Sequence, residues 1–457
     1  MPTTKLFKVS AAIAASFLAG AITYYWTREP NGPKSDQTQL TAGLNLDQDP
    51  EPSDILPEEN PQLPRGPASA IEAAAARPNV ILIFIDDAGM QWAPVPTPNI
   101  AALYNTGTKL GQAYAQPACS PSRSQLLTSQ NAGKWGHGFN PPIAVPNGIE
   151  TWPKLLQSAG VRTGFIGKWH TLNRHPADSG FDESPLWFDA GAHDYFVNEG
   201  LLTGNDSQPA PPVADHLTDR FAASAVKFIN ENKDPVRPFF LYLATNSVHL
   251  PDQSEPENIA KCTGIPGLDT DAKRAYCGNV LHLDALVGKV RAAAPPNTLI
   301  IFTSDNGCQT YKQPACSSGI LKGQKNSINE GGIRVPMIMH WPGVLPQKFT
   351  FRQPVTIRDL GPTILAAMQA PSLKIADGQN LIPVLTGQAK LPVRDLVFGR
   401  KGVNGSIRRG DWKYLITGEL YNLKADPGES LNVAAQNPKV VEELRNARAT
   451  IVRNWTP

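Results

Sequence analysis

The stretch NVILIFIDD, residues 79–87, decides the fold of this chain. Residues 79–85 form a continuous run rich in β-branched side chains, which is typical of a strand covered on both faces. Two carboxylates, Asp86 and Asp87, follow this run directly. We therefore predict a buried strand of a parallel sheet that ends in two acidic residues.

Three further runs predict strands of the same kind, at residues 162–166, 239–244 and 298–303. Helical stretches lie between the runs, among them residues 151–158 and 222–232. This alternation predicts an α/β fold with a mainly parallel central sheet, flanking helices and right-handed crossovers.

After about residue 387 the sequence changes character. Short alternating segments with turn residues occupy residues 397–416, and an amphipathic stretch follows from Pro438 to Val452. These features predict a smaller C-terminal antiparallel sheet with one helix.

Polar side chains follow every predicted strand of the central sheet. Beyond the second, third and fourth strands come Lys168 with His170, then His249, then Asp305 with Asn306. Ligands of an open parallel sheet bind beyond the carboxyl ends of its strands, so we expect these residues to share one site with the two aspartates. A single aspartate after a strand is often a turn or helix cap, but four coincidences favour a functional site.

The acidic members of this group predict a site for a hard divalent cation. Asp86, Asp87, Asp305 and Asn306 offer only oxygen ligands, which favour Ca²⁺ or Mg²⁺ over zinc. We place Ca²⁺ first, because flexible carboxylate cages suit it. Three carboxylates packed together repel one another, which calls for a cation or for raised pKa values.

A second motif is PACSPSRSQLLT, residues 117–128. Residues 122–128 have helix-forming character behind Pro121, a residue favoured in a first helical turn. Cys119 is expected just before the helix, where free N–H groups and the helix dipole stabilise an anion. The local sequence leaves two alternatives open: an activated nucleophile with Arg123 pointing at it, or an inert buried cysteine.

The core of this motif, CSPSR at residues 119–123, resembles the signature of the formylglycine-dependent (type I) sulfatases, a family of arylsulfatase-like enzymes. The resemblance extends over roughly residues 78–452. Six further segments carry it: residues 79–89, Thr-Pro-Asn-Ile at 97–100, Gly-Lys-Trp-His at 167–170, Ser-Asp-Asn-Gly at 304–307, Lys325 ahead of Glu-Gly-Gly-Ile-Arg-Val-Pro at 330–336, and Tyr421 through Pro-Gly-Glu at 427–429.

The resemblance implies a fold like that of alkaline phosphatase with a smaller C-terminal subdomain. It implies that Cys119 is oxidised to Cα-formylglycine by a formylglycine-generating maturation enzyme. It also implies a set of Ca²⁺ ligands, namely Asp86, Asp87, Asp305, Asn306 and the modified Cys119.

The resemblance further implies catalytic roles in the hydrolysis of a sulfate monoester. Asp305 deprotonates one hydroxyl of the aldehyde hydrate, which attacks sulfur in line. His249 protonates the leaving alcohol, and the remaining hydroxyl loses its proton toward His170 as sulfate leaves. The implied catalytic residues are Cys119, Arg123 (which orients the formylglycine), His170, His249 and Asp305, and the implied sulfate-binding residues are Lys168 and Lys325.

The resemblance allows more than one substrate class and more than one function. Sulfated carbohydrate is slightly favoured over aryl sulfate. The alternatives are a phosphate or phosphonate ester hydrolase on the same scaffold, and a non-catalytic protein that binds sulfated glycans. Two segments depart from the family pattern: Ser129 and Gln130 follow Thr128 where Thr-Gly-Arg is usual, and Thr171 replaces a leucine.

The N-terminal part of the chain predicts export. Residues 1–28 contain an apolar, uncharged run at 9–26 behind two lysines, which fits a signal peptide or a membrane anchor. Residues 29–77 read as an acidic, proline-rich linker, 78–388 as the sulfatase domain and 389–457 as the C-terminal subdomain. We expect a periplasmic, cell-surface or secreted protein, with a tether to the membrane if the run is retained.

Export allows disulfide bonds, and the chain has five cysteines. Their spacing predicts two local pairs, Cys262 with Cys277 and Cys308 with Cys316, which leaves Cys119 as the odd one.

Composition excludes other classes of protein. Among 457 residues, 42 Lys and Arg face 40 Asp and Glu, for a net charge of +2. The sequence has no concentrated basic stripe, so we exclude nucleic acid as a partner. The hydrophobic content of 41% excludes a wholly disordered or fibrous chain.

Overall fold

The computed structural model describes residues 77–92, 94–136, 145–146, 148–172 and 174–455. The expected signal or anchor segment lies outside the described residues, as does all of the expected linker except Arg77. Within the described ranges, no helix is both long enough and apolar enough to cross a membrane.

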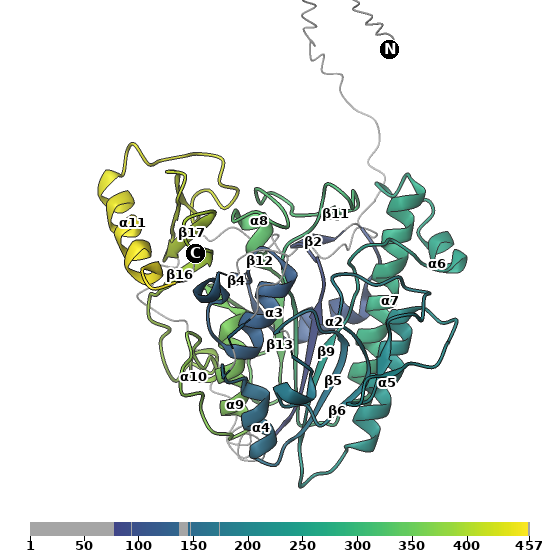
Figure 1. The fold of residues 1–457 in the computed structure, drawn as a ribbon. Coiled ribbons are helices and arrows are strands. Elements are labelled where there is room, and N and C mark those ends of the chain that lie inside the picture. Colours follow the sequence, from purple (N-terminus) through teal and green to yellow (C-terminus); the bar gives the residue numbers. More distant parts are fainter. Residues whose placement is uncertain (1–76, 93, 137–144, 147, 173, 456–457) are drawn as a thin grey trace, which may run out of the picture. The chain divides into compact units, whose positions relative to one another are not determined.

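A ten-stranded sheet forms the centre of the fold (Figure 1), with the strand order β14-β3-β13-β10-β1-β9-β5-β6-β7-β8. Its five inner strands are all parallel: β10 (Thr298–Ser304), β1 (Asn79–Ile85), β9 (Phe239–Ala244), β5 (Arg162–Lys168) and β6 (Glu183–Phe188). The four predicted strands are therefore confirmed, and β5 runs two residues further than predicted, to Lys168.

The outer strands add antiparallel pairings that the sequence analysis did not foresee. β13 runs antiparallel to β10 and to β3, and β7 runs antiparallel to β6 and to β8. The outer strands are β3 (Thr108–Leu110), β13 (Met337–His340), β14 (Phe349–Phe351), β7 (Leu202–Thr203) and β8 (Gln208–Pro209).

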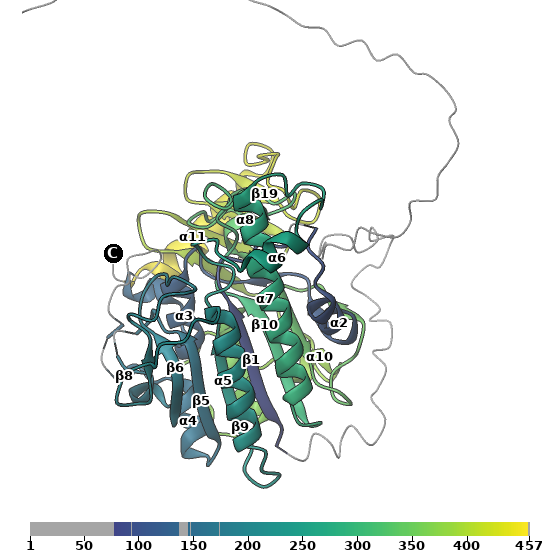
Figure 2. The same cartoon turned by 90° about the vertical axis from the view of Figure 1, so that its right-hand side faces the viewer.

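Strand β1 shows why its sequence is apolar throughout. Val80, Leu82 and Phe84 belong to the core on one face of the sheet, which the helices α3, α4 and α9 cover. The alternate residues belong to the core on the other face, beneath α2, α5 and α7 (Figure 2). Full burial of one such side chain stabilises the fold by about 1.5–3 kcal/mol. The helices are α2 (Pro98–Thr106), α3 (Cys119–Thr128), α4 (Trp152–Ser158), α5 (Leu217–Glu231), α6 (Pro256–Lys261), α7 (Asp271–Ala293), α8 (Glu330–Ile333), α9 (Leu360–Ala367) and α10 (Ile382–Leu385).

Helix α5 begins at Leu217, five residues before the predicted start. His216 caps it, because its side chain accepts a hydrogen bond from the backbone N–H of Thr218. Leu217 and Phe221 are buried against the sheet, so the tertiary structure adds a turn to the predicted helix.

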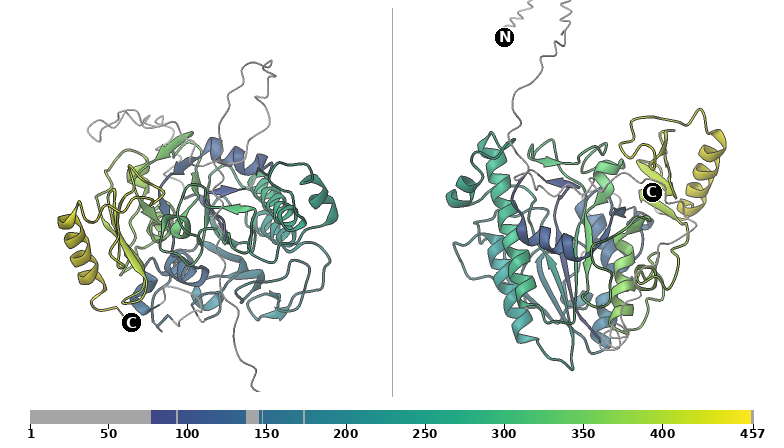
Figure 3. Two further views of the ribbon diagram at one scale, coloured as in Figure 1. Left: turned by 90° about the horizontal axis from the view of Figure 1, so that it is seen from above. Right: turned by 180° about the vertical axis from the view of Figure 1, so that it is seen from behind.

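The C-terminal segment forms a four-stranded antiparallel sheet in the order β16-β17-β18-β19, as predicted. Helix α11 (Pro438–Val452) has the predicted bounds and packs on this sheet through Leu444 and Val452. Figure 3 shows β16 and β17 between α11 and the rest of the described chain. The strands are β16 (Asp395–Gly399), β17 (Gly405–Arg409), β18 (Trp412–Leu415) and β19 (Leu420–Asn422). The proposed boundary at residue 388 stays a prediction and falls between α10 and β16.

Short strands join the loops above the central sheet. β12 pairs with β4, β4 with β15, and β11 with β2. Their bounds are β2 (Gln91–Trp92), β4 (Ala113–Tyr114), β11 (Cys316–Ser317), β12 (Arg334–Val335) and β15 (Val355–Thr356). Both predicted disulfides are present, Cys262 with Cys277 and Cys308 with Cys316, and Cys119 is free and buried.

Candidate active site

Parallel strand ends bring the predicted site residues to one edge of the central sheet. Asp86 and Asp87 follow β1, Asp305 and Asn306 follow β10, and Lys168 is the last residue of β5. All five side chains are fully buried. The backbone N–H of Asp87 donates to Oδ1 of Asp305 at 3.2 Å, so the two acidic strand ends contact each other directly.

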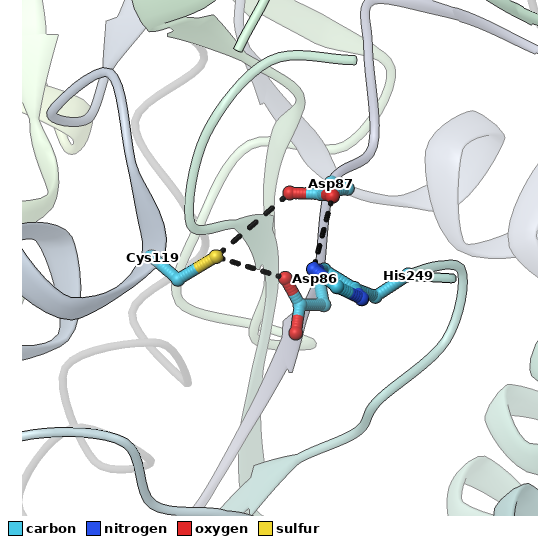
Figure 4. A group of neighbouring side chains, drawn as sticks. All are labelled: Asp86, Asp87, Cys119 and His249. Carbon is cyan, nitrogen blue, oxygen red and sulfur yellow. Dashed lines mark hydrogen bonds and ion pairs between the residues drawn. The ribbon is translucent and has the colours of Figure 1, made fainter. Parts of the chain in front are cut away.

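Helix α3 begins at Cys119 itself, three residues earlier than predicted. Ala118 precedes it in extended conformation. The Cys119 sulfur lies 3.4 Å from Oδ1 of Asp86 and 3.9 Å from Oδ1 of Asp87 (Figure 4). The first turn of the helix thus presents residue 119 to both acidic side chains.

The unmodified Cys119 thiol is not an activated nucleophile in this setting. Burial raises its pKa well above the usual range, and the carboxylates of Asp305 and Asp86 raise it further. Of the two alternatives that the local sequence left open, the inert buried cysteine fits the unmodified residue.

Three basic side chains lie among the three carboxylates. Arg123 Nη2 lies 2.8 Å from Asp305 Oδ2 and 3.4 Å from Asp86 Oδ2. Lys168 Nζ lies 2.5 Å from Asp86 Oδ2, and Lys325 Nζ lies 2.7 Å from Asp87 Oδ1. Mutual repulsion of the carboxylates is therefore relieved by protein cations, a possibility that the charge argument from sequence did not include.

The carboxylates differ in acidity for identifiable reasons. Burial raises the pKa of Asp86, but Lys168, His249 and Arg123 outweigh burial and hold it well below its usual range. Burial, followed by the charge of Asp86, raises the pKa of Asp305 to about 7. The cluster thus combines one strongly acidic carboxyl group with one that takes up a proton near neutrality.

The donor set fits a hard cation. Oδ1 of Asn306 is buried and has no hydrogen-bond partner among the described residues, while its Nδ2 donates to Asp87 Oδ1 at 2.7 Å. Asp86, Asp87, Cys119 and His249 offer ligand atoms that all lie within 4.8 Å of one another, and the two carboxylates are the hard donors of this group. An orphaned amide oxygen beside carboxylate oxygens is the type of ligand that Ca²⁺ takes.

The two predicted histidines lie at this edge in different settings. His249 Nε2 lies 3.4 Å from Asp87 Oδ2, and its Nδ1 contacts the carbonyl oxygen of Leu250 at 2.8 Å. Burial lowers the pKa of His249, although Asp87 opposes the shift. His170 Nδ1 is buried and finds no partner in the part of the chain that the structure describes, and burial, with the charge of Lys168, lowers the pKa of its ring to about 3.

Two further side chains, not predicted from the sequence, hold these histidines. The Tyr195 hydroxyl lies 2.9 Å from the carbonyl oxygen of His249, and Asp189 Oδ1 accepts the backbone N–H of His170 at 3.1 Å. Both anchors lie in loops, and no pattern in the sequence marks them.

Local backbone geometry accounts for the Gly-Lys-Trp-His segment. Gly167 has φ +110°, and a Cβ there would lie 2.0 Å from the carbonyl oxygen of Ala244, so only glycine fits. Thr171, which departs from the family pattern, forms a 2.8 Å hydrogen bond with Ser124 on α3. The departure thus adds a polar link between helix α3 and the segment that follows β5.

A second group of possible metal ligands contains His216, Asp219 and His282, which the sequence analysis left without a role. The two imidazole rings are stacked, with centroids 3.7 Å apart and planes only 5° from parallel. A metal ion lies in the plane of each imidazole that binds it. Two stacked, nearly parallel imidazoles therefore cannot bind the same ion. Instead, His282 contacts Asp219 at 2.7 Å and Glu255 at 2.6 Å, which makes it a bridge between carboxylates.

Comparisons with known proteins agree with this geometry. Residues 78–370 match the family described as Sulfatase. N-acetylgalactosamine-6-sulfatase of Canis lupus familiaris is 30% identical over 397 residues, covering 76% of this chain and 73% of that protein. Arylsulfatase A of Homo sapiens is 28% identical over 455 residues, covering 82% and 87%.

Solved structures agree with the sequence comparisons. The crystal structure of Ps i-CgsB in complex with k-i-k-neocarrahexaose superimposes with a TM-score of 0.76 at 31% identity, covering 83% of this chain and 94% of that one. All the site residues described above, from Asp86 to Lys325, fall within the matched range 78–370. The chain therefore belongs to the sulfatase family and is a sulfuric ester hydrolase.

Proposed function

We propose that this enzyme hydrolyses sulfate monoesters of carbohydrates through a Cα-formylglycine at position 119 and a bound Ca²⁺. The observation that carries the proposal is the position of Cys119 Sγ, within 4 Å of both Asp86 and Asp87 at the end of β1. A thiol with a raised pKa serves poorly as a nucleophile there, whereas an aldehyde hydrate would supply two hydroxyl groups on one carbon.

Five positions would hold the cation: Asp86, Asp87, Asp305, Asn306 and the modified residue 119. Bound Ca²⁺ would polarise a hydroxyl group and a sulfate oxygen as a Lewis acid. The buried Oδ1 of Asn306 supports this assignment, since no atom of the described ranges forms a hydrogen bond with it.

The protein's own side chains would supply charge and protons. Lys168 and Lys325, each at a carboxylate oxygen in this structure, would neutralise the non-bridging sulfate oxygens. Asp305, held by Arg123 Nε and Nη2 at 3.1 and 2.8 Å, would take the proton of the attacking hydroxyl group. Its raised pKa suits a general base near neutral pH.

Two histidines would complete the proton transfers. His249 Nδ1 donates its proton to the Leu250 carbonyl oxygen, and Nε2 faces Asp87 in the carboxylate cluster, so Nε2 carries a second proton in the imidazolium form of the ring. That second proton would go to the leaving alcohol, which returns the ring to its neutral form. His170 Nδ1 forms no hydrogen bond with any described residue, which supports a role in accepting the proton released with sulfate.

The proposed substrate class rests on a relative. Ps i-CgsB, 31% identical, was solved with an oligosaccharide bound, which supports a sulfated saccharide for this chain. Paired assays with sulfated saccharides, nitrophenyl sulfate and nitrophenyl phosphate test this assignment. We expect sulfate ester turnover to exceed phosphate turnover, and the reverse order would overturn the proposal.

Maturation is tested by mass spectrometry of the tryptic peptide Leu110–Arg123. Protein made in a host with a formylglycine-generating enzyme is expected to carry the aldehyde or its hydrate at position 119. A Cys119→Ala variant provides the matched inactive control. An intact thiol in fully active enzyme would contradict the formylglycine assignment.

Export is part of the proposal. The two disulfides support it, because such bonds persist in oxidising compartments. N-terminal sequencing of the mature protein would separate the remaining alternatives: a start beyond residue 20 means a cleaved signal, whereas an intact terminus in the membrane fraction means a tether.

A further inference from the structure

A buried ion cluster joins the C-terminal sheet to the loops of the active site. Its centre is Lys413 on β18, whose Nζ lies 2.9 Å from Glu330 Oε1 and 2.9 Å from Glu429 Oε1. The three side chains are at most 1% exposed. Glu330 Oε2 also accepts the hydroxyl of Tyr114 at 2.6 Å, and Arg408 contacts the same hydroxyl.

Glu330 is the first residue of the short helix α8, and this turn of chain contacts the loop that carries Asn306. The carbonyl oxygen of Gly332 accepts the backbone N–H of Gly307 at 3.0 Å. A Cβ on Gly307 would lie 1.9 Å from the carbonyl oxygen of Gly331, so the two backbones touch. Gly307 directly follows Asn306, so these backbone contacts fix the position of Asn306.

The same turn holds the loop that carries Lys325. The Gly331 N–H donates to the carbonyl oxygen of Lys322 at 2.7 Å. The Lys325 N–H in turn donates to the carbonyl oxygen of Cys308 at 2.7 Å. Displacement of Glu330 would therefore shift both a proposed Ca²⁺ ligand and a proposed sulfate-binding lysine.

Glu429 closes the cluster from the C-terminal side. Its Oε2 accepts the backbone N–H of Glu330 at 2.7 Å, and its carbonyl oxygen contacts Lys322 Nζ at 3.4 Å. Glu429 has φ +52°, a left-handed conformation that a non-glycine residue keeps only when its surroundings enforce it. In this conformation the Glu429 carboxylate contacts both Lys413 and the backbone N–H of Glu330.

We propose that Lys413 is a positioning residue for the sulfatase reaction, through which the C-terminal sheet sets the places of Asn306 and Lys325. The proposal rests on the proposed function of that site. A buried ion pair adds little net stability compared with apolar packing of the same volume, because desolvation offsets the attraction. It does impose geometry, since each charge needs its partner at a fixed place.

The test compares three variants of the full-length, matured enzyme. Lys413→Met keeps the chain length and removes the charge, Lys413→Arg restores a cation, and Lys424→Met alters an exposed lysine of the same subdomain as a control. We measure thermal stability, Ca²⁺ binding and inorganic sulfate binding by calorimetry on the metal-free and Ca²⁺-loaded protein, and kcat and KM on a sulfate ester.

Lys413→Met is expected to bind Ca²⁺ and sulfate several-fold more weakly and to lose about 10- to 100-fold in kcat, as small displacements of catalytic groups do. Lys413→Arg is expected to recover part of each loss, and Lys424→Met to behave as wild type. A folded Lys413→Met with wild-type Ca²⁺ binding, sulfate binding and kcat would overturn the inference.

If Lys413→Met does not fold, Glu429→Gln carries the same test, because it removes one charge and keeps the side-chain shape. Unchanged binding and kcat in folded Glu429→Gln would then overturn the inference. Wild-type enzyme without any sulfate ester turnover would instead defeat the proposed function, and the binding measurements would still decide the role of Lys413.

Discussion

The sulfur of Cys119 lies 3.4 Å from the Asp86 carboxylate, although 33 positions of the sequence separate the two residues. Strand β1 ends at Ile85 and helix α3 begins at Cys119, so the contact joins a strand end to the first turn of a helix. Both side chains are fully buried. Any chemical change at Cys119 therefore alters the immediate surroundings of the Asp86 carboxylate. Substitutions of the side chains around this pair test what the site does.

Replacement of His249 should act through the leaving group. We expect His249→Gln to lower kcat/KM for an alkyl or saccharide sulfate by about 10²- to 10⁴-fold, because loss of a general acid has that effect. Nitrophenyl sulfate, whose leaving group needs little protonation, should lose much less. Equal losses on both substrates would contradict the general-acid role of Nε2, which lies 3.4 Å from Asp87.

Removal of the Asn306 side chain should weaken Ca²⁺ binding. We expect Asn306→Ala to raise the Kd for Ca²⁺ by at least the ~10- to 100-fold that outer-shell partners of a metal contribute. Oδ1 of Asn306 has no hydrogen-bond partner among the described residues. In the metal-free protein the substitution should therefore remove only the two hydrogen bonds that Nδ2 donates. Calorimetric titration checks this, with Asn205→Ala as control, because the Asn205 side chain bonds the carbonyl oxygen of Asp182 at 2.8 Å. Unchanged Ca²⁺ affinity would remove Asn306 from the ligand set.

The Asp219–His282 pair should make stability depend on acid pH. Although burial raises the pKa of Asp219, the hydrogen bond and charge of His282 outweigh burial and lower it to about 2, below the usual range of an aspartate. A lowered carboxyl pKa contributes stability above pH ~4, and this contribution is lost as pH falls toward 2. Urea unfolding at pH 5 and pH 3 should show a smaller loss in Asp219→Asn than in wild type.

The matched control for that experiment is Asp215→Asn, an exposed aspartate just before helix α5. It should lose stability between pH 5 and pH 3 as wild type does. If Asp219→Asn lost as much free energy of unfolding between pH 5 and pH 3 as wild type does, the Asp219–His282 pair would not contribute to the loss of stability in acid.

A glycine at position 129 should stabilise the enzyme. Ser129 ends helix α3 with φ +53°, and its buried hydroxyl has no hydrogen-bond partner within the ranges that the structure describes. A left-handed conformation costs a residue with a Cβ roughly 1–2 kcal/mol, and glycine is free of that cost. After the entropy of glycine in the unfolded chain is subtracted, we expect Ser129→Gly to gain about 1 kcal/mol in urea unfolding.

Ser129→Ala separates the two effects in that prediction. It removes the hydroxyl and keeps the left-handed strain, so its gain should be smaller than that of Ser129→Gly. A glycine variant less stable than wild type would show that the helix end is not strained.

Much of the fold could be predicted because its strongest signals are local. The run from Asn79 to Ile85 is apolar on both faces, and only a strand between two layers of helices buries both. Helix α11 could be bounded at Pro438 and Val452 by its amphipathic period. The antiparallel pairings of β13 and β7 escaped prediction, because strands of two to four residues carry little pattern.

By itself the sequence determined which residues could form the site, because strand ends, cysteine motif and lysine segments each have a local pattern. The tertiary structure alone decided which of them are partners. It paired Arg123 with Asp305 across 182 positions and joined Lys413 to Glu330 across 83. The physical reason is that charge pairing in a buried site depends on distances between side chains, and those distances are set only when the sheets and loops pack.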